Sequence, residues 1–442
     1  MNSKKKLHIE TYGCQMNFSD SEIVMSVLMD TYEHTSDIKS ADLILINTCS
    51  IRDNAEERIW NRLKEIRSLK KRNKSLKIGI IGCMAERLKE EWLEKEPVID
   101  LVVGPDAYRE LPKLLHTVLQ GENAINTILS EEETYADISP VRYNTNGISA
   151  FISIMRGCQN FCSYCVVPYT RGKERSRDPK TIENEAQELF NQGYREITLL
   201  GQNVNSYLWN ENGKDFHFWD LMEMVARINP LLRIRFATSH PKDLSNELIQ
   251  IIARFPNICK SIHLPVQSGS NNMLKKMNRK YTREWYLDRI DEIKKQIPDC
   301  SLSTDIIAGF CDETEQDHQD TLNMMKEVGY EAAFMFKYST RPGTLAHNKF
   351  EDNVPEELKI KRLQEIISLQ QELSLISNKK DLGKTMEVMI EGFSKRSKEH
   401  QFGRNSQNKV VVFPKTNLEK GTYVQVKITE CSAATLKGFV VE

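Results

Sequence analysis

The sequence predicts an α/β protein in three parts: an N-terminal α/β domain with a parallel sheet, a central partial (β/α)6 barrel and a small all-β barrel. Short apolar runs alternate with helical stretches over the first part of the chain, and this alternation restarts near residue 148 and repeats six times. Apolar and polar residues then alternate one by one near the C-terminus, which is the period of a β-strand. A chain of 442 residues is long enough for two to four domains.

The N-terminal domain is expected over residues 5–122. Four short apolar runs that end at glycine or polar residues are its expected strands, over residues 6–13, 41–48, 76–82 and 99–104. Helical stretches such as residues 54–72 separate these runs, and this order is typical of a parallel sheet. Residues 130–147 are polar and rich in turn formers, so we expect a linker there.

The partial barrel is expected over residues 144–378. Its six expected strands are residues 149–156, 196–203, 232–240, 259–268, 301–310 and 331–340. Helices lie between them, such as residues 179–193, which have Pro179 in the first turn and Gly193 at the C-terminal stop. Six βα units are too few to close an eight-stranded barrel, so we expect an open one, with its active site at the C-terminal ends of the strands.

A helix and a β module follow the barrel. The helix is expected over residues 355–377, with one apolar side formed by Leu363, Ile366, Ile367, Leu373 and Ile376. Residues 379–442 contain 12 Lys and Arg against 7 Asp and Glu, a charge of about +5. A small basic β-barrel suits nucleic-acid binding. A solvated, lysine-rich surface explains the same composition equally well.

Composition limits the function classes. The 61 basic and 62 acidic residues nearly balance, so contacts with nucleic acid or a membrane must come from local patches. The sequence has no run of 18 apolar residues and no apolar segment after its basic N-terminus, so we expect a cytoplasmic protein without a membrane span. Its ten cysteines are more typical, in a reducing compartment, of metal binding or chemistry than of disulfides.

Three of these cysteines lie within eight residues. Cys158, Cys162 and Cys165 have C-x3-C-x2-C spacing on the loop that leaves the first expected barrel strand. A compact loop of this kind brings three thiolates to three corners of a [4Fe-4S] cluster. Zinc is disfavoured because neither a second cysteine pair nor a histidine lies nearby in the sequence. The iron without a protein ligand can bind S-adenosylmethionine (SAM), and this spacing resembles the radical SAM superfamily.

Polar residues at other strand ends are candidates for binding SAM. Tyr164 occupies the aromatic position that lies near the adenine in that superfamily, and residues 266–281 resemble its ribose-contacting segment. The remaining candidates are Gln202, Asn203, Ser239, His240, Gln267, Ser268 and Asp305. For each of these alone, a role in a turn or a helix cap is the stronger expectation. Residues 304–317 resemble the fifth-strand motif of the superfamily, although Cys311 and Asp312 replace its usual Pro-Gly.

A second cysteine triad is spread over the N-terminal domain. Cys14, Cys49 and Cys83 each follow directly on an expected strand. Because the C-terminal ends of parallel strands meet along one edge of a sheet, we expect these three thiols to lie together. A second cluster with one open iron fits this arrangement, whereas three buried core cysteines are the alternative.

The cysteine-bearing segments together resemble the radical SAM methylthiotransferases. The matching motifs are "TYGCQMNFSDSE", "LINTCSIRDNAEER", "IGCMAER" and "RGCQNFCSYCVVPYTRGKERSR". The resemblance covers essentially the whole chain, with a methylthiotransferase N-terminal domain, a radical SAM core and a C-terminal TRAM module. Gln15 and Met16 after the first cysteine favour the branch that acts on dimethylallyladenosine in tRNA. They disfavour the branches that act on threonylcarbamoyladenosine or on a ribosomal aspartate.

The resemblance implies methylthiolation of carbon 2 of the modified adenine at tRNA position 37, with two [4Fe-4S] clusters and SAM as cofactors. Cys14, Cys49 and Cys83 would hold the auxiliary cluster that provides sulfur. One SAM would methylate that sulfur, and a second, bound at the Cys158, Cys162 and Cys165 cluster, would give the radical. A non-catalytic iron-sulfur protein for electron transfer or RNA binding is disfavoured, because such proteins use four-cysteine clusters.

The resemblance also implies partners. We expect the anticodon stem-loop of tRNA, an electron donor of the flavodoxin or ferredoxin type, a sulfur donor, no membrane and a monomeric enzyme. Cations after the cluster loop are expected to bind phosphates of the anticodon loop without reading its sequence. They are Arg171, Lys173, Arg175 and Arg177, and an exposed, solvated charge run is the alternative.

Overall fold

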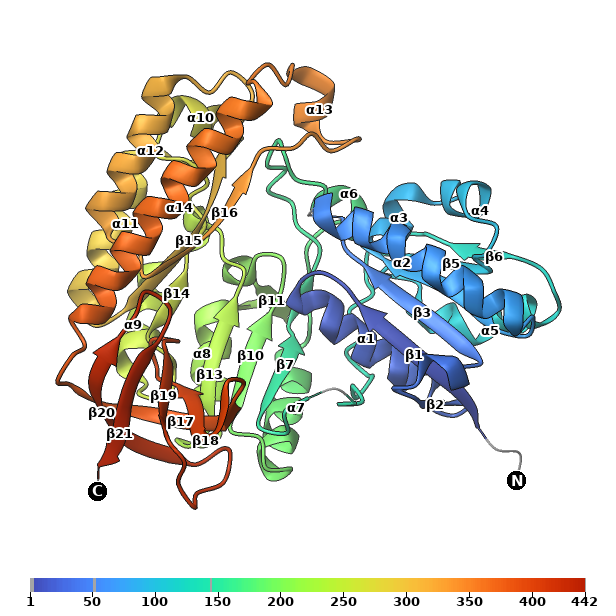
Figure 1. Ribbon diagram of the computed structural model, residues 1–442, viewed down its shortest axis with the longest axis horizontal. Coiled ribbons are helices and arrows are strands. Elements are labelled where there is room, and N and C mark those ends of the chain that lie inside the picture. Colours follow the sequence, from blue (N-terminus) through green and yellow to red (C-terminus); the bar gives the residue numbers. More distant parts are fainter. Residues whose placement is uncertain (1–3, 51–52, 144, 442) are drawn as a thin grey trace.

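The computed structural model describes residues 4–50, 53–143 and 145–441 and confirms the predicted fold class (Figure 1). A parallel α/β domain, a six-stranded partial barrel and a closed five-stranded barrel follow one another along the chain. In the described part of the chain, no helix combines the length and the apolar character that a membrane span requires.

The N-terminal sheet contains six parallel strands in the order β2-β1-β3-β4-β5-β6. Their bounds are β1 Lys5–Thr11, β2 Tyr32–His34, β3 Leu43–Thr48, β4 Lys77–Gly82, β5 Leu101–Val103 and β6 Ala124–Asn126. The four predicted strands are β1, β3, β4 and β5. The prediction omitted the two edge strands, which have three residues each and therefore no readable period.

Helices cover both faces of this sheet. Successive side chains of a strand point to opposite faces. Leu43 and Leu45 therefore pack with α1 (Gln15–Leu28) and α5 (Leu111–Leu119). Ile44 and Ile46 instead pack with the helices of the other face. Those helices are α2 (Asp53–Arg72), α3 (Cys83–Leu88) and α4 (Glu91–Lys95).

The partial barrel consists of two three-stranded parallel sheets joined by an isolated bridge between Ile234 and Ile258. The first contains β7 (Ser149–Ser153), β10 (Glu196–Leu200) and β13 (Arg233–Ala237); the second contains β14 (Ser261–His263), β15 (Ser301–Ala308) and β16 (Ala332–Lys337). The longer helices of this part are α7 (Pro179–Asn191), α8 (Phe218–Ala226), α9 (Asn246–Arg254), α11 (Arg283–Gln296), α12 (Glu315–Val328) and α14 (Glu356–Lys379). In the described residues β7 and β16 are unpaired edges, so the barrel is open as predicted.

Short helices and strands lie in the segments that connect the barrel strands. The helices are α6 (Val167–Arg171), α10 (Asn271–Lys276) and α13 (Leu345–Lys349), and β11 (Leu208–Glu211) pairs with β12 (Lys214–His217). The predicted strand 149–156 is two strands, because β8 (Met155–Arg156) leaves the barrel sheet and pairs antiparallel with β9 (Arg175–Ser176). The segment between β8 and β9 contains the compact cysteine motif.

Helix α14 was predicted to have one apolar side, and the structure confirms this in part, because Leu363, Ile366 and Leu373 pack with the barrel core. Ile366 is buried, but the Ile376 side chain is 54 % exposed. The buried side of α14 also contains charged and amide groups: Arg362 donates to the Glu313 carboxylate, and Gln370 donates to the Tyr330 carbonyl oxygen. The helix is therefore held by polar bonds to its neighbours as well as by apolar packing.

The C-terminal barrel is closed in the order β17-β18-β19-β21-β20. Its strands are β17 (Thr385–Ser394), β18 (Ser397–Arg404), β19 (Val410–Pro414), β20 (Tyr423–Cys431) and β21 (Leu436–Val441). Arg233 and Arg235, near the start of β13, donate to the carbonyl oxygens of Arg404 and Asn405. The small barrel is thus fastened beneath the N-terminal ends of the first barrel sheet, as Figure 1 shows in red.

Candidate metal centres and the cofactor site

The compact cysteine motif lies on a loop that is closed at its base by β8 and β9. Gly157 precedes Cys158 with φ +78°, and a Cβ there would lie 1.8 Å from the Lys173 carbonyl oxygen. The Cys158 N–H donates to the Gly172 carbonyl oxygen across the same contact. Glycine is therefore required where the two ends of the loop cross.

The far side of this loop is anchored to the C-terminal end of helix α10. The Ser163 N–H donates to the Met277 carbonyl oxygen, and its hydroxyl donates to that of Lys276. The Cys165 N–H donates to the Cys162 carbonyl oxygen, which turns the chain tightly. Burial raises the pKa of Cys158 to about 11 and also raises that of Cys165, so these thiols need a metal or a cation to ionise.

Arg279 supplies a cation at this loop, and the sequence analysis missed it. Its Nη1 lies 3.1 Å from the Cys162 Sγ and 3.3 Å from the Tyr164 hydroxyl. Nη2 donates to the Pro265 carbonyl oxygen, and Nε donates to the Tyr281 hydroxyl. The guanidinium group is buried and its orientation is set by these four contacts, so it favours an anionic group at the cysteine loop.

Unpartnered polar atoms lie at the C-terminal ends of the first barrel sheet. In the described residues, five side chains after β7, β10 and β13 have buried oxygen or nitrogen atoms without a hydrogen-bond partner: Ser153, Gln202, Asn205, Ser239 and His240. Such atoms cost about 1–3 kcal/mol each when nothing satisfies them. Burial lowers the pKa of His240 to about 2, so its ring is neutral. A ligand with amino, carboxylate and hydroxyl groups fits this set, as SAM does.

Two of the other SAM candidates, Asn203 and Ser268, bond to neighbouring protein residues. Asn203 donates to Asp243 and accepts from the His240 N–H. Ser268 shares a hydrogen bond with Thr321 and accepts from the Ser270 N–H. These contacts correspond to the turn and cap alternative.

Gln267 and Asp305 lie side by side, because the Gln267 N–H donates to the Asp305 carbonyl oxygen. The Asp305 carboxylate is 3.4 Å from the His263 Nε2. Tyr164 contacts Arg279, as described above. The contacts of the eight predicted residues therefore make Gln202, Ser239 and His240 the strongest of the SAM candidates.

The turn after β15 departs from the superfamily sequence, and Asp312 adopts there a left-handed backbone conformation of the kind that favours glycine. Asp312 stands where that motif has glycine, and its φ is +60°. The side chain of Asn353 accepts from the Asp312 N–H, which holds the left-handed conformation. Cys311 is buried in an apolar cluster beside Phe310 and Tyr338.

The second triad meets at one edge of the N-terminal sheet, as predicted from topology. Cys14 precedes α1, Cys49 follows β3, and Cys83 begins α3 directly after β4. Gly13 has φ +120°, and a Cβ there would lie 2.3 Å from the Cys49 Cβ, so β1 and β3 approach closely only with glycine. A hydrogen bond between Cys14 and Cys49 lowers the pKa of Cys14 to about 6; burial opposes this shift and the charge of Arg171 supports it.

Three thiols are the protein ligand set of a [4Fe-4S] cluster that keeps one iron open. Within the described ranges, no three His, Cys, Asp or Glu side chains already form a site for one metal ion. A cubane places its cysteine ligands on three different irons, so its thiolates lie further apart than the ligands of one ion. A [4Fe-4S] cluster held by three cysteines would keep one iron without a protein ligand.

Three of the four cations that were predicted to bind RNA are buried. Arg171 is 2 % exposed and bonds to Asp20, Arg175 bonds to both carboxylate oxygens of Asp106, and Arg177 bonds to Glu185. Their guanidinium groups are therefore occupied inside the protein, and the prediction that they contact phosphates does not fit their positions. Lys173 alone is exposed, where it pairs with Glu131.

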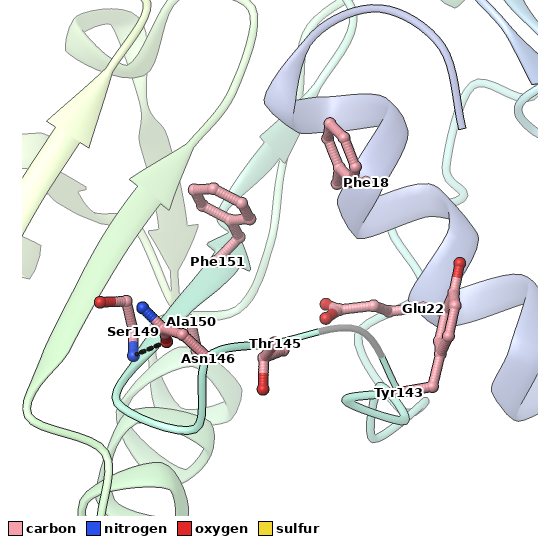
Figure 2. A pocket seen from close by; sticks show the side chains of 8 residues that line it. All are labelled: Phe18, Glu22, Tyr143, Thr145, Asn146, Ser149, Ala150 and Phe151. Carbon is pink, nitrogen blue, oxygen red and sulfur yellow. Dashed lines mark hydrogen bonds between the residues drawn. The ribbon is translucent and has the colours of Figure 1, made fainter. Parts of the chain in front are cut away.

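A small pocket is lined by none of the six cysteines of the two triads. It has a volume of about 250 Å³ and lies between α1 and the start of β7 (Figure 2). Phe18 and Phe151 line one side of it, and Glu22 and Tyr143 line another. Glu22 is paired with Arg142 of the segment predicted as a linker. The described residues of this segment form no helix or strand, and Arg142 bonds to both domains through Glu22 and Glu185.

Three family models match the chain, in the order of its three parts. Residues 6–104 match Uncharacterized protein family UPF0004, residues 152–325 match the Radical SAM superfamily, and residues 379–441 match the TRAM domain.

Among solved structures, the chain is similar to the radical SAM methyltransferase TsrM from Kitasatospora setae. The TM-score is 0.58 at 14 % identity over 78 % of this chain and 75 % of that one. It is also similar to the cobalamin-dependent SAM radical enzyme OxsB, with a TM-score of 0.54 at 14 % identity over 83 % of this chain and 56 % of that one. These likenesses concern the fold alone.

Curated relatives match over nearly the full length. A protein of Parabacteroides distasonis is 57 % identical over 99 % of this chain and 96 % of its own length. One of Bacteroides fragilis is 58 % identical over 98 % of this chain and 95 % of its own length. Both are named tRNA-2-methylthio-N(6)-dimethylallyladenosine synthase. At this identity and coverage, and with both cysteine triads in place, the chain belongs to the tRNA-2-methylthio-N(6)-dimethylallyladenosine synthase family of radical SAM enzymes.

Proposed function

We propose that this chain attaches a methylthio group to carbon 2 of N(6)-dimethylallyladenosine at position 37 of tRNA. The observation that carries the proposal is that two adjoining domains each contain three cysteines, one fewer than the four ligands of a cubane cluster. One group follows β8, and the other lies at the edge of the N-terminal sheet. When bound, the two [4Fe-4S] clusters and SAM supply the radical, the sulfur and the methyl group of this reaction. A carbon radical is needed because the C–H bond at this position is too strong for acid–base chemistry.

The chain's own residues hold and orient these groups. Cys158, Cys162 and Cys165 would hold the cluster that binds SAM, and Cys14, Cys49 and Cys83 would hold the auxiliary cluster. The unpartnered atoms of Gln202, Ser239 and His240 would bond to the polar groups of SAM. Arg279 would keep the Cys162 thiolate and the Tyr164 ring in place from behind.

The inner wall of the partial barrel is suited to receive the target base. Leu302, Thr304 and Ile306 of β15 are buried, which leaves their neighbours facing inward. Among these, Asp305 lies 3.4 Å from the His263 imidazole, and the Phe334 side chain beside it is 54 % exposed.

An exposed aromatic ring next to polar side chains is how proteins stack and hydrogen-bond an unpaired base. Ile307, two residues further along β15, and Tyr164 of the cluster loop pack against the same apolar cluster, which connects this strand to the cysteine loop.

The tRNA would be held further out by exposed cations. Lys173 is the one member of the predicted phosphate-binding run that remains available. The TRAM barrel exposes Lys395, Arg396 and Lys398 at the β17–β18 turn. Lys415 lies 5.6 Å from the ring of the exposed Phe393 on the same barrel. An exposed aromatic ring among cations is typical of single-stranded RNA binding.

We further propose the domain limits 5–122, 144–378 and 379–442, a monomeric enzyme and a cytoplasmic location. A reducing protein of the flavodoxin or ferredoxin type would deliver electrons, and a separate sulfur donor would renew the auxiliary cluster. The exposed side of the cysteine loop, where Phe161 and Tyr169 are exposed, is the part of the cluster region that such a donor could approach.

The test uses the anaerobically reconstituted full chain with reductant, SAM and defined tRNAs. One arm contains dimethylallyladenosine tRNA, a second contains threonylcarbamoyladenosine tRNA, and a third contains ribosomal protein with the target aspartate. After digestion, mass spectrometry should find a methylthio product in the first arm. A product in another arm alone would assign a different substrate, and no product in any arm would refute the proposed activity.

A further inference from the structure

Arg171 belongs to the radical SAM core but contacts the cysteines of the other domain. It ends α6, six residues after Cys165. Its Nε lies 3.2 Å from the Cys83 Sγ. Its Nη2 donates to Asp20 at 2.7 Å and lies 3.2 Å from the Asn17 Oδ1. One guanidinium group thus joins the loop of one triad to the thiols of the other.

In the described residues, the ion-pair network around Arg171 contains more arginines than carboxylates. Arg171 and Arg156 share the Asp20 carboxylate, and Arg156 and Arg175 share Asp106. All five side chains are buried, so three positive charges face two negative ones. The next buried carboxylate, Glu86, has its own cation, because Lys89 lies 3.7 Å away.

An uncompensated charge in such a place is costly, so an anionic group is expected there. Three thiolates around a [4Fe-4S] core carry about one net negative charge, which is what the network lacks. The Arg171 Nη1 is buried and has no hydrogen-bond partner among the described residues, so the guanidinium can donate one more bond. Phosphate cannot use it, because the side chain is 3 % exposed.

We propose that Arg171 is a positioning residue for the auxiliary cluster: it balances the charge of that cluster, stabilises its reduced form and fastens it against the radical SAM loop. This rests on the auxiliary cluster of the proposed function, but it concerns the cluster's charge and not the tRNA reaction. A positive group beside a cluster favours the added electron, so removing it makes reduction harder.

The test measures the auxiliary cluster alone, in the full chain with Cys158, Cys162 and Cys165 replaced by alanine. Iron content and the reduction midpoint, followed by electron paramagnetic resonance, are compared for this parent and for Arg171→Met and Arg171→Lys. Arg175→Met is the matched control, since Arg175 is equally buried in the same network but bonds to Asp106 and to no cysteine. Lys173→Met, an exposed neighbour, is a second control that leaves the network intact.

We expect about four irons in the parent. In Arg171→Met, the equilibrium constant for one-electron reduction should fall about tenfold, which lowers the midpoint by about 59 mV. Arg171→Lys should recover part of this shift, and neither control should reproduce it. Loss of iron in Arg171→Met alone, restored by Arg171→Lys, would also support the proposal.

Equal midpoints and iron contents in Arg171→Met and the controls would overturn this inference while leaving the proposed function intact. A parent chain that loads no iron at Cys14, Cys49 and Cys83 would instead contradict the auxiliary cluster, and with it the proposed function.

Discussion

Replacing Asp20 by asparagine removes the central carboxylate of the contact between the N-terminal domain and the radical SAM core. Asp20 is fully buried in α1 and accepts hydrogen bonds from Arg156 at 2.8 Å and from Arg171 at 2.7 Å. Burial raises the pKa of Asp20, but the charges of Arg156 and Arg171 outweigh it and hold the pKa below its ordinary value. The carboxylate is therefore ionised at neutral pH, and asparagine keeps its shape without its charge.

The size of the effect follows from what the substitution leaves behind. Two guanidinium groups lose their shared counter-charge, and breaking a buried ion pair by removing one partner costs about 3–5 kcal/mol. In a unit of 150–250 residues, each kcal/mol lowers the melting temperature by about 2–4 °C. We therefore expect the transition that separates or unfolds the N-terminal domain to fall by roughly 6–20 °C.

Differential scanning calorimetry of the apo chain measures this shift. Glu131→Gln is the control, because Glu131 pairs with Lys173 of the same cation run but is exposed and should change nothing measurable. The reasoning would be refuted if Asp20→Asn melted within a degree or two of Glu131→Gln. That result would mean that the buried network contributes nothing to holding the two domains together.

Three further predictions concern the sites. Gly13→Ala and Gly157→Ala should each lose about half of the roughly eight irons of two cubanes, because their new Cβ atoms collide with Cys49 and Lys173; Gly193→Ala, which has φ +98° but nothing within 4 Å, should keep its iron. Arg279→Met should slow reductive SAM cleavage at least about tenfold, measured as 5′-deoxyadenosine, by removing the cation beside Cys162; an unchanged rate would show that this cation is dispensable. Burial raises the pKa of Glu86 from 4.5 to about 7, so its stabilising contribution is present below pH 4.5 and is lost as the pH rises through 7. Urea titrations should therefore show the parent losing about 2–3 kcal/mol relative to Glu86→Gln between pH 5 and 8, and parallel curves would contradict this.

The grouping of the cysteines could be predicted from the sequence because it depends on local information. Cys158, Cys162 and Cys165 are close in the chain, and Cys14, Cys49 and Cys83 each follow a strand whose direction the βα alternation reveals. Parallel topology then brings the second triad together without any knowledge of side-chain contacts. The open barrel and the small β-barrel follow in the same way from repeat number and period.

The roles of the arginines could not be predicted from the sequence. Asp20 is 136 residues from Arg156, and Asp106 is 69 residues from Arg175. The sequence of a run of cations is the same whether the side chains face solvent or are buried in a domain contact. The two cases differ only in the partners of the cations, which lie elsewhere in the chain. Arg279 was missed for the same reason, since its partner Cys162 is 117 residues away.

The short edge strands and the polar side of α14 were also missed, because both depend on neighbours. Strands β2 and β6 have three residues each and are defined only by pairing with β1 and β5. Along α14, the buried positions of Arg362 and Gln370 are decided by Glu313 and Tyr330 on other elements.

In the proposed reaction, a radical formed at the Cys158, Cys162 and Cys165 cluster acts on carbon 2 of the adenine held inside the partial barrel. The most direct measurement uses dimethylallyladenosine tRNA deuterated at that carbon, with mass analysis of the 5′-deoxyadenosine formed. We expect this 5′-deoxyadenosine to carry deuterium and the tRNA to gain the methylthio group in the same turnover. Methylthiolated tRNA accompanied by deuterium-free 5′-deoxyadenosine would contradict the proposed reaction.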